Sequence, residues 1–488
     1  ALAAILRSNN SQLKQLLQNK FMKHLIRNLL LSSLGLFFIS TFAHAKIENV
    51  LFLISDDLKA STLGAYGDAV VQTPNIDALA AEGMVFKRGY CQGTTCGPSR
   101  RSFMHSRYRD DKGITMGENF INNGFYSARV GKIFHMRVPG DIVAGTDGQD
   151  VEACWTESFN SPGLEAHTAG VYSEFNHNIF TTSMKVRAST AEKDRWFVSV
   201  NYDGDGSDQP DHKTASKAIE LIREHGKSDK PFFIAAGFVR PHYPNVAPNQ
   251  YFDLYPYQDI TLPETREGDL DDIPKDGHTA VTSLNDPIGK YPDNQKRFWS
   301  SYYATITYMD DQVGRIVAEL EAQGLRESTA IVFIGDHGYH LGEHFFWQKS
   351  NVHEDVTRVP FIISAPGFKS GESDSFAELV DIYPTVSELV GVSVPQSVQG
   401  KSLVPVLKNP RKSVREAAFT VGNHNEFALR GDQWVYMLYK DDQEELYDMK
   451  KDPKQFTNLA NDQKYAKVKA EWRKKLEDRI SKAGLSRG

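Results

Sequence analysis

Two acidic motifs each follow a strongly apolar run of this sequence. Asp56 and Asp57 come directly after one run, and Asp336 and His337 follow another. Such runs are typical of strands buried in a parallel sheet, and the carboxyl ends of these strands meet at one edge. Carboxylates that meet there repel one another unless a cation lies between them, and three carboxylates suit Ca²⁺ or Mg²⁺. The alternatives are that the Asp pair lies in a turn or helix cap, and that His337, a softer ligand than these ions usually choose, is a polar loop residue.

A third motif, Cys96-Gly97-Pro98-Ser99-Arg100, has the features of an anion site. Pro98 favours the first turn of a helix, so that Cys96 and the backbone amides after it lie at a helix N-terminus. Arg100 adds a planar fork of donors for an oxyanion. The alternative is that Cys96 is a buried or disulfide-bonded cysteine.

The elements that must position these motifs alternate between strands and helices. Apolar runs predict buried strands, and apolar residues at helical spacing followed by Gly predict helices. We expect strands at 49–55, 231–236 and 329–334, and helices over 73–83 and 302–320. This alternation indicates an α/β fold with a large, mostly parallel sheet between helices.

Other parts of the sequence have a different character. Residues 136–230 and 243–295 are rich in Asp, Gly, Asn, Pro and Tyr with weak periodicity, so we expect long surface insertions there. Towards the C-terminus, strands at 434–439 and 445–448 precede an amphipathic helix over 465–480. This pattern predicts a smaller antiparallel subdomain.

The N-terminal part carries the pattern of an export signal. A basic stretch after Met22 precedes the apolar run 29–42 and the cleavage motif Ala43-His44-Ala45. The alternative is a transmembrane anchor, but the run is shorter than the roughly 20 residues that a span needs. We divide the sequence into an upstream extension (1–21), a signal peptide (22–45), a catalytic domain (46–390) and a C-terminal α+β subdomain (391–488). We expect an exported protein, periplasmic or secreted, with no membrane span after signal cleavage.

The net charge and the number of cysteines limit the possible partners and disulfides of the chain. The net charge is −6, whereas a chain that coats nucleic acid is usually basic, so we expect no nucleic-acid partner. Three cysteines are too few for a disulfide framework, and the sequence leaves open whether Cys91 and Cys154 are bridged.

The motif Cys-x-Pro-Ser-Arg at 96–100 resembles the modification signature of type I sulfatases, in which the Cys is converted to formylglycine. Further motifs extend the resemblance from about residue 48 to residue 460: Ile54-Ser-Asp-Asp57, Thr73-Pro-Asn-Ile-Asp77, Gly131-Lys132, Gly335-Asp-His-Gly338, Glu444-Glu-Leu-Tyr-Asp448, Asp452-Pro453 and Asn458-Leu-Ala460. The branch that includes iduronate-2-sulfatase and bacterial polysaccharide-acting relatives fits best. The motifs similar to that branch are Val130-Gly-Lys-Ile-Phe-His135, Arg240-Pro-His-Tyr-Pro244, Asp336-His337, Leu341-Gly-Glu-His344 and Trp347-Gln-Lys349.

The resemblance implies an alkaline-phosphatase-like sulfatase fold and a set of site residues. The implied ligands of Ca²⁺, with Mg²⁺ as an alternative, are Asp56, Asp57, Cys96 (as formylglycine), Asp336 and His337. The implied catalytic residues are Cys96, whose hydrated formylglycine attacks sulfur, Arg100, which steadies its oxygen, Lys132 and Lys349, which neutralise the sulfate, His242, the general acid, and His135, the base that regenerates the aldehyde. The implied partners are a sulfated carbohydrate and a formylglycine-generating maturation enzyme.

The expected activity is hydrolysis of a sulfate ester on a sugar within a polysaccharide or oligosaccharide. A uronate 2-sulfate follows by analogy with the branch, and sulfated rhamnose or galactose of an algal polysaccharide such as ulvan stays open. One alternative is a phosphatase or phosphonate monoester hydrolase of the same superfold. Another is an inactive exported sugar-binding relative. Loss of a metal carboxylate or of Arg100 would indicate the latter, and all of them are present.

Overall fold

The computed structural model describes residues 46–109, 112–185, 187 and 196–487. The predicted extension over 1–21 and the signal peptide over 22–45 lie outside these residues, and the proposed domain boundary at 390/391 stays a prediction. None of the described helices combines the length and the hydrophobicity needed to cross a bilayer.

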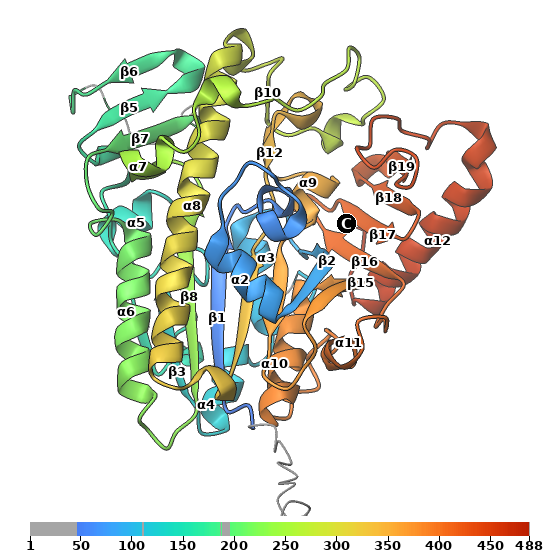
Figure 1. Cartoon of the computed structure of the whole chain (residues 1–488). Coiled ribbons are helices and arrows are strands. Elements are labelled where there is room, and N and C mark those ends of the chain that lie inside the picture. Colours follow the sequence, from blue (N-terminus) through green and yellow to red (C-terminus); the bar gives the residue numbers. More distant parts are fainter. Residues whose placement is uncertain (1–45, 110–111, 186, 188–195, 488) are drawn as a thin grey trace, which may run out of the picture. The chain divides into compact units, whose positions relative to one another are not determined.

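An eight-stranded mixed sheet forms the centre of the molecule (Figure 1). Its strands, in spatial order, are β15 (Gly371–Glu378), β2 (Met84–Tyr90), β14 (Phe361–Ser364), β11 (Thr329–Gly335), β1 (Asn49–Asp56), β8 (Phe232–Pro241), β3 (Tyr126–Gly131) and β4 (Glu157–Phe159). Only β14 runs antiparallel to its two neighbours, β11 and β2, among these described strands. The expected large, mostly parallel sheet is therefore confirmed, as are its three predicted strands.

Helices cover both faces of the sheet because the strands are apolar on both sides. In β1, Leu51 and Leu53 belong to one buried cluster, whereas Val50, Phe52 and Ile54 belong to another. The helices on the first face are α2 (Pro74–Glu82), α6 (Pro210–His225) and α8 (Pro292–Ala322); those on the second include α3 (Cys96–His105), α4 (Met116–Asn122), α10 (Ile382–Val390) and α11 (Val404–Lys408). This is the layered arrangement that the alternating pattern predicts.

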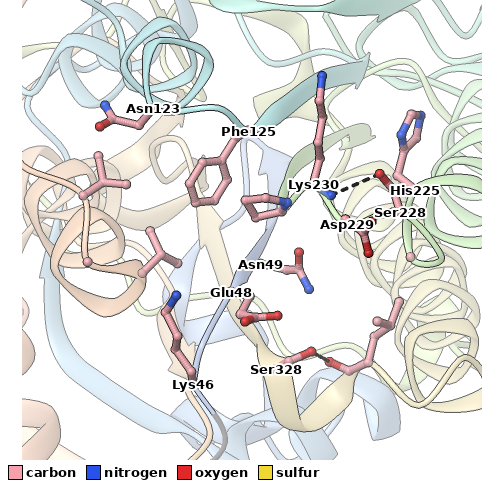
Figure 2. A pocket seen from close by; sticks show the side chains of 16 residues that line it. Lys46, Glu48, Asn49, Asn123, Phe125, His225, Ser228, Asp229, Lys230 and Ser328 are labelled. Atoms are coloured by element: carbon pink, nitrogen blue, oxygen red, sulfur yellow. Dashed lines mark hydrogen bonds between the residues drawn. The ribbon is translucent and has the colours of Figure 1, made fainter.

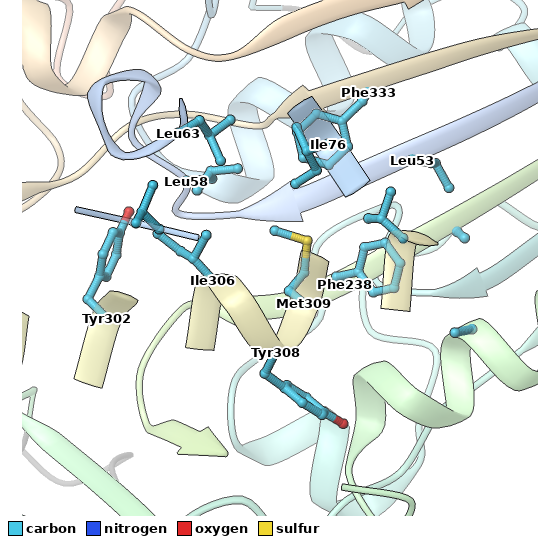
Figure 3. Close-up of a cluster of buried hydrophobic side chains, with 14 of the residues drawn as sticks. Leu53, Leu58, Leu63, Ile76, Phe238, Tyr302, Ile306, Tyr308, Met309 and Phe333 are labelled. Carbon is cyan, nitrogen blue, oxygen red and sulfur yellow. The ribbon is translucent and has the colours of Figure 1, made fainter. Parts of the chain in front are cut away.

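Helix α8 supplies much of the core on the first face. Figure 3 shows its Ile306 and Met309 packed beside Leu53 of β1 and Phe333 of β11, together with Ile76 of α2. All five side chains are fully buried. The helix begins ten residues before the predicted start at residue 302, at Pro292, which is favoured in a first helical turn.

A separate four-stranded antiparallel sheet lies near the C-terminus, as expected. It consists of β16 (Ala417–Val421), β17 (Phe427–Gly431), β18 (Trp434–Leu438) and β19 (Glu444–Asp448), and α12 (Ala466–Lys482) packs against it (Figure 1). Trp472, Leu476 and Ile480 of α12 are buried at helical spacing, which confirms the predicted amphipathic helix.

The part predicted as a surface insertion over 136–230 contains regular elements that its weak periodicity does not indicate. This part contains α6 and the strands β5 (Val171–Glu174), β6 (Ile179–Thr181) and β7 (Val198–Tyr202), which form a four-stranded sheet with β9 (Asn245–Pro248). The buried positions of α6 include two small residues, Ala215 and Ala218, among charged ones, so its apolar period is weak in the sequence.

A cavity of about 570 Å³ opens where β1 begins, at the amino ends of the parallel strands (Figure 2). Lys46, Glu48, Asn49 and Lys230 are among its lining residues. It contains none of the predicted site residues, which all belong to the opposite end of the sheet.

Candidate active site

Four predicted site residues lie at the carboxyl ends of four adjacent parallel strands. Asp336 directly follows β11, Asp56 ends β1, His242 directly follows β8 and Lys132 directly follows β3. In parallel sheets, this edge is where ligand sites form. The sheet order therefore brings together residues that are far apart in the sequence.

Cys96 begins α3, as predicted, and its buried thiol lies at the centre of these residues. Its Sγ is 3.4 Å from His337 Nε2, 3.4 Å from Lys349 Nζ and 3.8 Å from Lys132 Nζ. The carboxylate Oδ1 of Asp57 lies 4.0 Å away. The environment of residue 96 thus contains two ammonium groups and an imidazole, which suits an anion.

Arg100 is fully buried and links the two acidic motifs. Its Nε donates to Asp336 Oδ2 at 2.8 Å, and its Nη2 donates to Asp56 Oδ1 at 3.0 Å. Nη1 donates to the carbonyls of Lys132 and Ile133. None of the hydrogen bonds found for Arg100 among the described residues runs to Cys96, so in this structure it organises the carboxylates.

Two lysines each pair with one carboxylate oxygen of the Asp56-Asp57 motif. Lys132 Nζ donates to Asp56 Oδ2, and Lys349 Nζ donates to Asp57 Oδ1. Lys132 follows Gly131, whose φ of +70° and close approach to Gly237 leave no room for a Cβ. The backbone of β3 can therefore turn towards β8 and bring this lysine to the thiol.

The electrostatics of the cluster favour negative charge on residue 96. Burial opposes ionisation of the Cys96 thiol, but Lys132 and Lys349 hold its pKa well below the usual value. Burial raises the pKa of Asp336 to about 6, against the lowering effect of Arg100. Burial would lower the pKa of His337, but the charge of Asp336 raises it to about 9. The surroundings of His337 thus attract positive charge.

The donor set fits a divalent cation. Ligand atoms of Asp56, Asp57, Cys96 and His337 all lie within 4.8 Å of one another, and all four residues are buried. Asp57 Oδ2 is buried without a hydrogen-bond partner in this structure, although His242 Nε2 lies 3.7 Å from it. His337 Nδ1 is 3.0 Å from the carbonyl of Gly338, which leaves Nε2 directed at the cluster, as in metal-ligating histidines.

Asp336 belongs to the candidate cation site less directly than the predicted ligands Asp56, Asp57 and His337. Its Oδ1 accepts from the backbone amides of Asp57 and His337, and its Oδ2 accepts from Arg100. Oδ2 keeps a second lone pair, so ligation through this oxygen stays compatible with these bonds.

A cavity of about 420 Å³ leads to Cys96, and the two predicted catalytic histidines line it. His242 Nδ1 lies 2.5 Å from the carbonyl of Tyr243, which directs Nε2 towards Asp57. The His135 side chain also helps to lower the pKa of the Cys96 thiol. The cavity can therefore place an ester beside the nucleophile position with a proton donor and acceptor nearby.

One supporting residue was missed in the sequence. Tyr302 is the first residue of the helix predicted over 302–320 from its apolar spacing, but its hydroxyl donates to the Asp57 carbonyl at 2.6 Å and accepts from the Lys59 amide at 3.0 Å. Asp57 has a positive φ of 63°, which is uncommon for a residue other than glycine. Tyr302 thus holds the strained turn that carries Asp57, and no local pattern in the sequence indicates this contact.

The other two cysteines are not bridged in the structure. Cys91 and Cys154 are free and buried. Burial raises the pKa of Cys154 to about 12, and that of Cys91 also rises. Neither thiol has the cationic surroundings of Cys96.

Comparison with known proteins agrees with this geometry. Residues 48–392, more than half of the chain, match the family model described as sulfatase. The chain belongs to the sulfatase family. Residues 342–482 also match a model described as the C-terminal part of N-sulphoglucosamine sulphohydrolase. The expected sulfuric ester hydrolase activity class is therefore confirmed.

Relatives cover most of this sulfatase. A sulfatase of Formosa agariphila is 31% identical over an alignment of 455 residues that covers 86% of this chain and 85% of that protein. Human iduronate 2-sulfatase is 31% identical over an alignment of 404 residues that covers 71% of this chain and 70% of that protein. The resemblance to the iduronate-2-sulfatase-like branch is thus confirmed.

Solved structures confirm the fold. A phosphonate monoester hydrolase of Agrobacterium radiobacter has a TM-score of 0.69 at 22% identity and covers 89% of this chain and 96% of its own. A protein solved with its substrate D-glucosamine-2-N,6-O-disulfate has a TM-score of 0.68 at 21% identity, with 90% and 98% covered. At these identities the likeness concerns the fold alone.

Proposed function

We propose that this sulfatase is exported and removes sulfate from a sugar of a polysaccharide or oligosaccharide, with residue 96 acting as formylglycine. The observation that carries the proposal is the convergence of Asp56, Asp57 and Asp336 with Arg100 and two lysines around residue 96. A sulfate ester is anionic and its leaving oxygen gains negative charge, so hydrolysis needs this concentration of positive charge in a buried site.

Two groups that the residues accommodate complete the proposed site. When present, formylglycine supplies a hydrated aldehyde as the oxygen nucleophile, and Ca²⁺ or Mg²⁺ supplies charge stabilisation. Asp56, Asp57, Asp336 and His337, with residue 96, would hold the cation. Arg100 keeps Asp56 and Asp336 in place through its hydrogen bonds.

The remaining residues bind the sulfate and move protons. Lys132 and Lys349, both within 4 Å of Cys96 Sγ, neutralise the sulfate oxygens. His242, which lines the cavity, protonates the leaving alcohol. His135, which also lines the cavity, removes the proton from the second hydroxyl of the hydrated formylglycine, so that sulfate is released and the aldehyde is regenerated.

The names of relatives support a sugar substrate. They include iduronate 2-sulfatase and, at 25% identity, N-acetylglucosamine-6-O-sulfatase of Bacteroides thetaiotaomicron. A uronate 2-sulfate and a sulfated algal polysaccharide such as ulvan are the two substrate classes to compare. The cleavage motif at Ala43–Ala45 supports export, and modification of Cys96 requires a formylglycine-generating enzyme as partner.

An activity screen tests the proposal. The matured enzyme is offered defined sulfated oligosaccharides, aryl sulfate, and phosphate and phosphonate monoesters with the same leaving groups, and released anions are measured. We expect kcat/KM to be highest for one sulfated sugar. Higher kcat/KM for a phosphate or phosphonate ester contradicts the proposal, and binding without turnover favours the inactive sugar-binding alternative.

The role of His242 predicts a dependence on the leaving group. Sugar alcohols are poor leaving groups that need a proton as the S–O bond breaks, whereas 4-nitrophenolate leaves without one. We expect His242→Ala to lower kcat by about 10²–10⁴-fold on a sugar sulfate and much less on 4-nitrophenyl sulfate. Steady-state kinetics on both substrates measures the difference.

His177→Ala serves as the matched control, because this histidine is 40% exposed and paired with Glu174 outside the cavity. It should leave both rates near those of the unchanged enzyme. Equal losses on both substrates in the His242 variant assign His242 to sulfate binding and leave the acid role to another residue.

A further inference from the structure

Arg101 and Gln149 form a polar pair on the wall of the active-site cavity. Both line the cavity together with Cys96 and His135. Arg101 Nη1 donates to Gln149 Oε1 at 3.1 Å, and the backbone amide of Gln149 donates to the His135 carbonyl at 2.8 Å. The pair is thus attached to helix α3 on one side and to the segment of His135 on the other.

The pair lies close to the reacting position. A Cβ placed on Gly97 would be 3.4 Å from Arg101 Nη1, 3.6 Å from Gln149 Oε1 and 3.7 Å from His135 Cβ. Gly97 directly follows the residue that is proposed to be the nucleophile. The guanidinium therefore lies over the first turn of α3, beside the space that a bound ester must occupy.

Arg101 differs from the other basic residues of the site in how its charge is paired. Arg100, Lys132 and Lys349 pair with the three carboxylates of the centre. Arg137, the other arginine of the cavity wall, is neutralised by Asp141, with Nη2 to Oδ1 at 2.8 Å and Nε to Oδ2 at 3.1 Å. Among the lysines and arginines that line the cavity in the described part of the chain, only Arg101 has no carboxylate partner.

We propose that Arg101, oriented by Gln149, binds a second anionic group on the sugar that carries the scissile sulfate. A guanidinium has five N–H donors in a planar fork that matches carboxylate and sulfate oxygens, and the bond to Gln149 uses one of them. The Gln149 amide nitrogen is a further donor next to the fork. The ligand chemistry is an oxyanion, either a uronate carboxylate or a second sulfate.

This inference rests on the proposed function and selects substrates within it. A neutral sugar with one sulfate leaves Arg101 without its ligand, whereas a doubly anionic sugar gains charge-assisted hydrogen bonds, which are about twice as strong as neutral ones. The site then prefers sugars with two anionic groups, and the preference is expressed mainly in KM.

The test uses three sugar sulfates that differ only at carbon 6. They are built on the ring turned over best in the activity screen and carry a hydroxymethyl, a carboxylate or a sulfated hydroxymethyl group there. Their kcat and KM are measured with the matured enzyme, with Arg101→Gln and Arg101→Lys, and with Arg137→Gln as the matched control. Thermal melting of each variant verifies that it is folded.

We expect Arg101→Gln to lower kcat/KM for a doubly anionic sugar by about 10- to 100-fold more than for the neutral one, the size of a lost hydrogen bond to a charged group. Arg101→Lys should restore part of this loss, because it keeps the charge and loses the fork. The anion with the larger loss, carboxylate or sulfate, identifies the natural group. Arg137→Gln should change the ratio by less than about threefold, since Asp141 already neutralises Arg137.

Three results overturn the inference while the proposed function stands. The first is equal kcat/KM of the unchanged enzyme for all three sugars, and the second is the same fold-loss on all three in Arg101→Gln. The third is an Arg137→Gln effect as large as that of Arg101→Gln. Turnover of 4-nitrophenyl sulfate without turnover of any sugar sulfate instead contradicts the proposed function, and the inference with it.

Discussion

Cys96→Ala should abolish turnover, with a loss of kcat on the order of 10⁶-fold, as expected when the nucleophile of a covalent hydrolase is removed. Alanine at this position cannot be converted to formylglycine, so the site keeps its charges but lacks the attacking oxygen. Hydrolysis of 4-nitrophenyl sulfate measures the loss. Peptide mass spectrometry of the unchanged, active enzyme should find residue 96 as formylglycine.

Cys154→Ala is the matched control, because Cys154 is equally buried and, among the described residues, its thiol is not paired with a lysine. This variant should keep its activity. A fully active preparation in which residue 96 is entirely unmodified cysteine contradicts the proposed nucleophile. In that case the low pKa of the Cys96 thiol would have to be explained by thiolate chemistry instead.

Removal of divalent cations should have the second largest effect. Without a cation, the carboxylates of the centre are stabilised by lysines and Arg100 alone, and the sulfate loses a major source of charge stabilisation. We expect chelation to lower kcat by about 10³-fold, which corresponds to roughly 4 kcal/mol, and added Ca²⁺ or Mg²⁺ to restore it. Steady-state assays after treatment with a chelator measure this.

A second readout does not depend on activity. A cation at 100 times its Kd should raise the free energy of unfolding by about 2.7 kcal/mol, which is measured as an upward shift of the melting temperature. Asp57→Asn should lose most of this shift. Asp432→Asn, which changes an exposed carboxylate outside the site, is the control and should keep the shift. Full activity of metal-free protein, or an equal shift in Asp57→Asn, contradicts the cation site as described.

The sequence alone indicated the elements that carry the site. The apolar run before Asp56 and the one before Asp336 are local signals, and both become buried parallel strands. Pro98 likewise indicated that Cys96 lies at the start of a helix. These predictions succeeded because strand burial and helix initiation depend on neighbouring residues.

Helix α6 was missed because the same kind of local signal is weak in its sequence. Its buried face includes small alanines among charged residues, so the apolar period that identifies a helix is weak there. Its packing against β8 and α8 stabilises it, and α8 lies far from it in the sequence.

By itself, the sequence determined the chemical types present: acidic strand ends, a cysteine at a helix start, and lysines and histidines in loops. Only the tertiary structure decided which of them meet. The order of β11, β1, β8 and β3 brings Asp336, Asp56, His242 and Lys132 to one edge. The tertiary structure also decided that Lys349 pairs with Asp57, 292 positions away, and that Arg101 keeps no carboxylate partner among the described residues. Such pairings depend on long-range strand order and on competition between charges in a buried space, which no local pattern records.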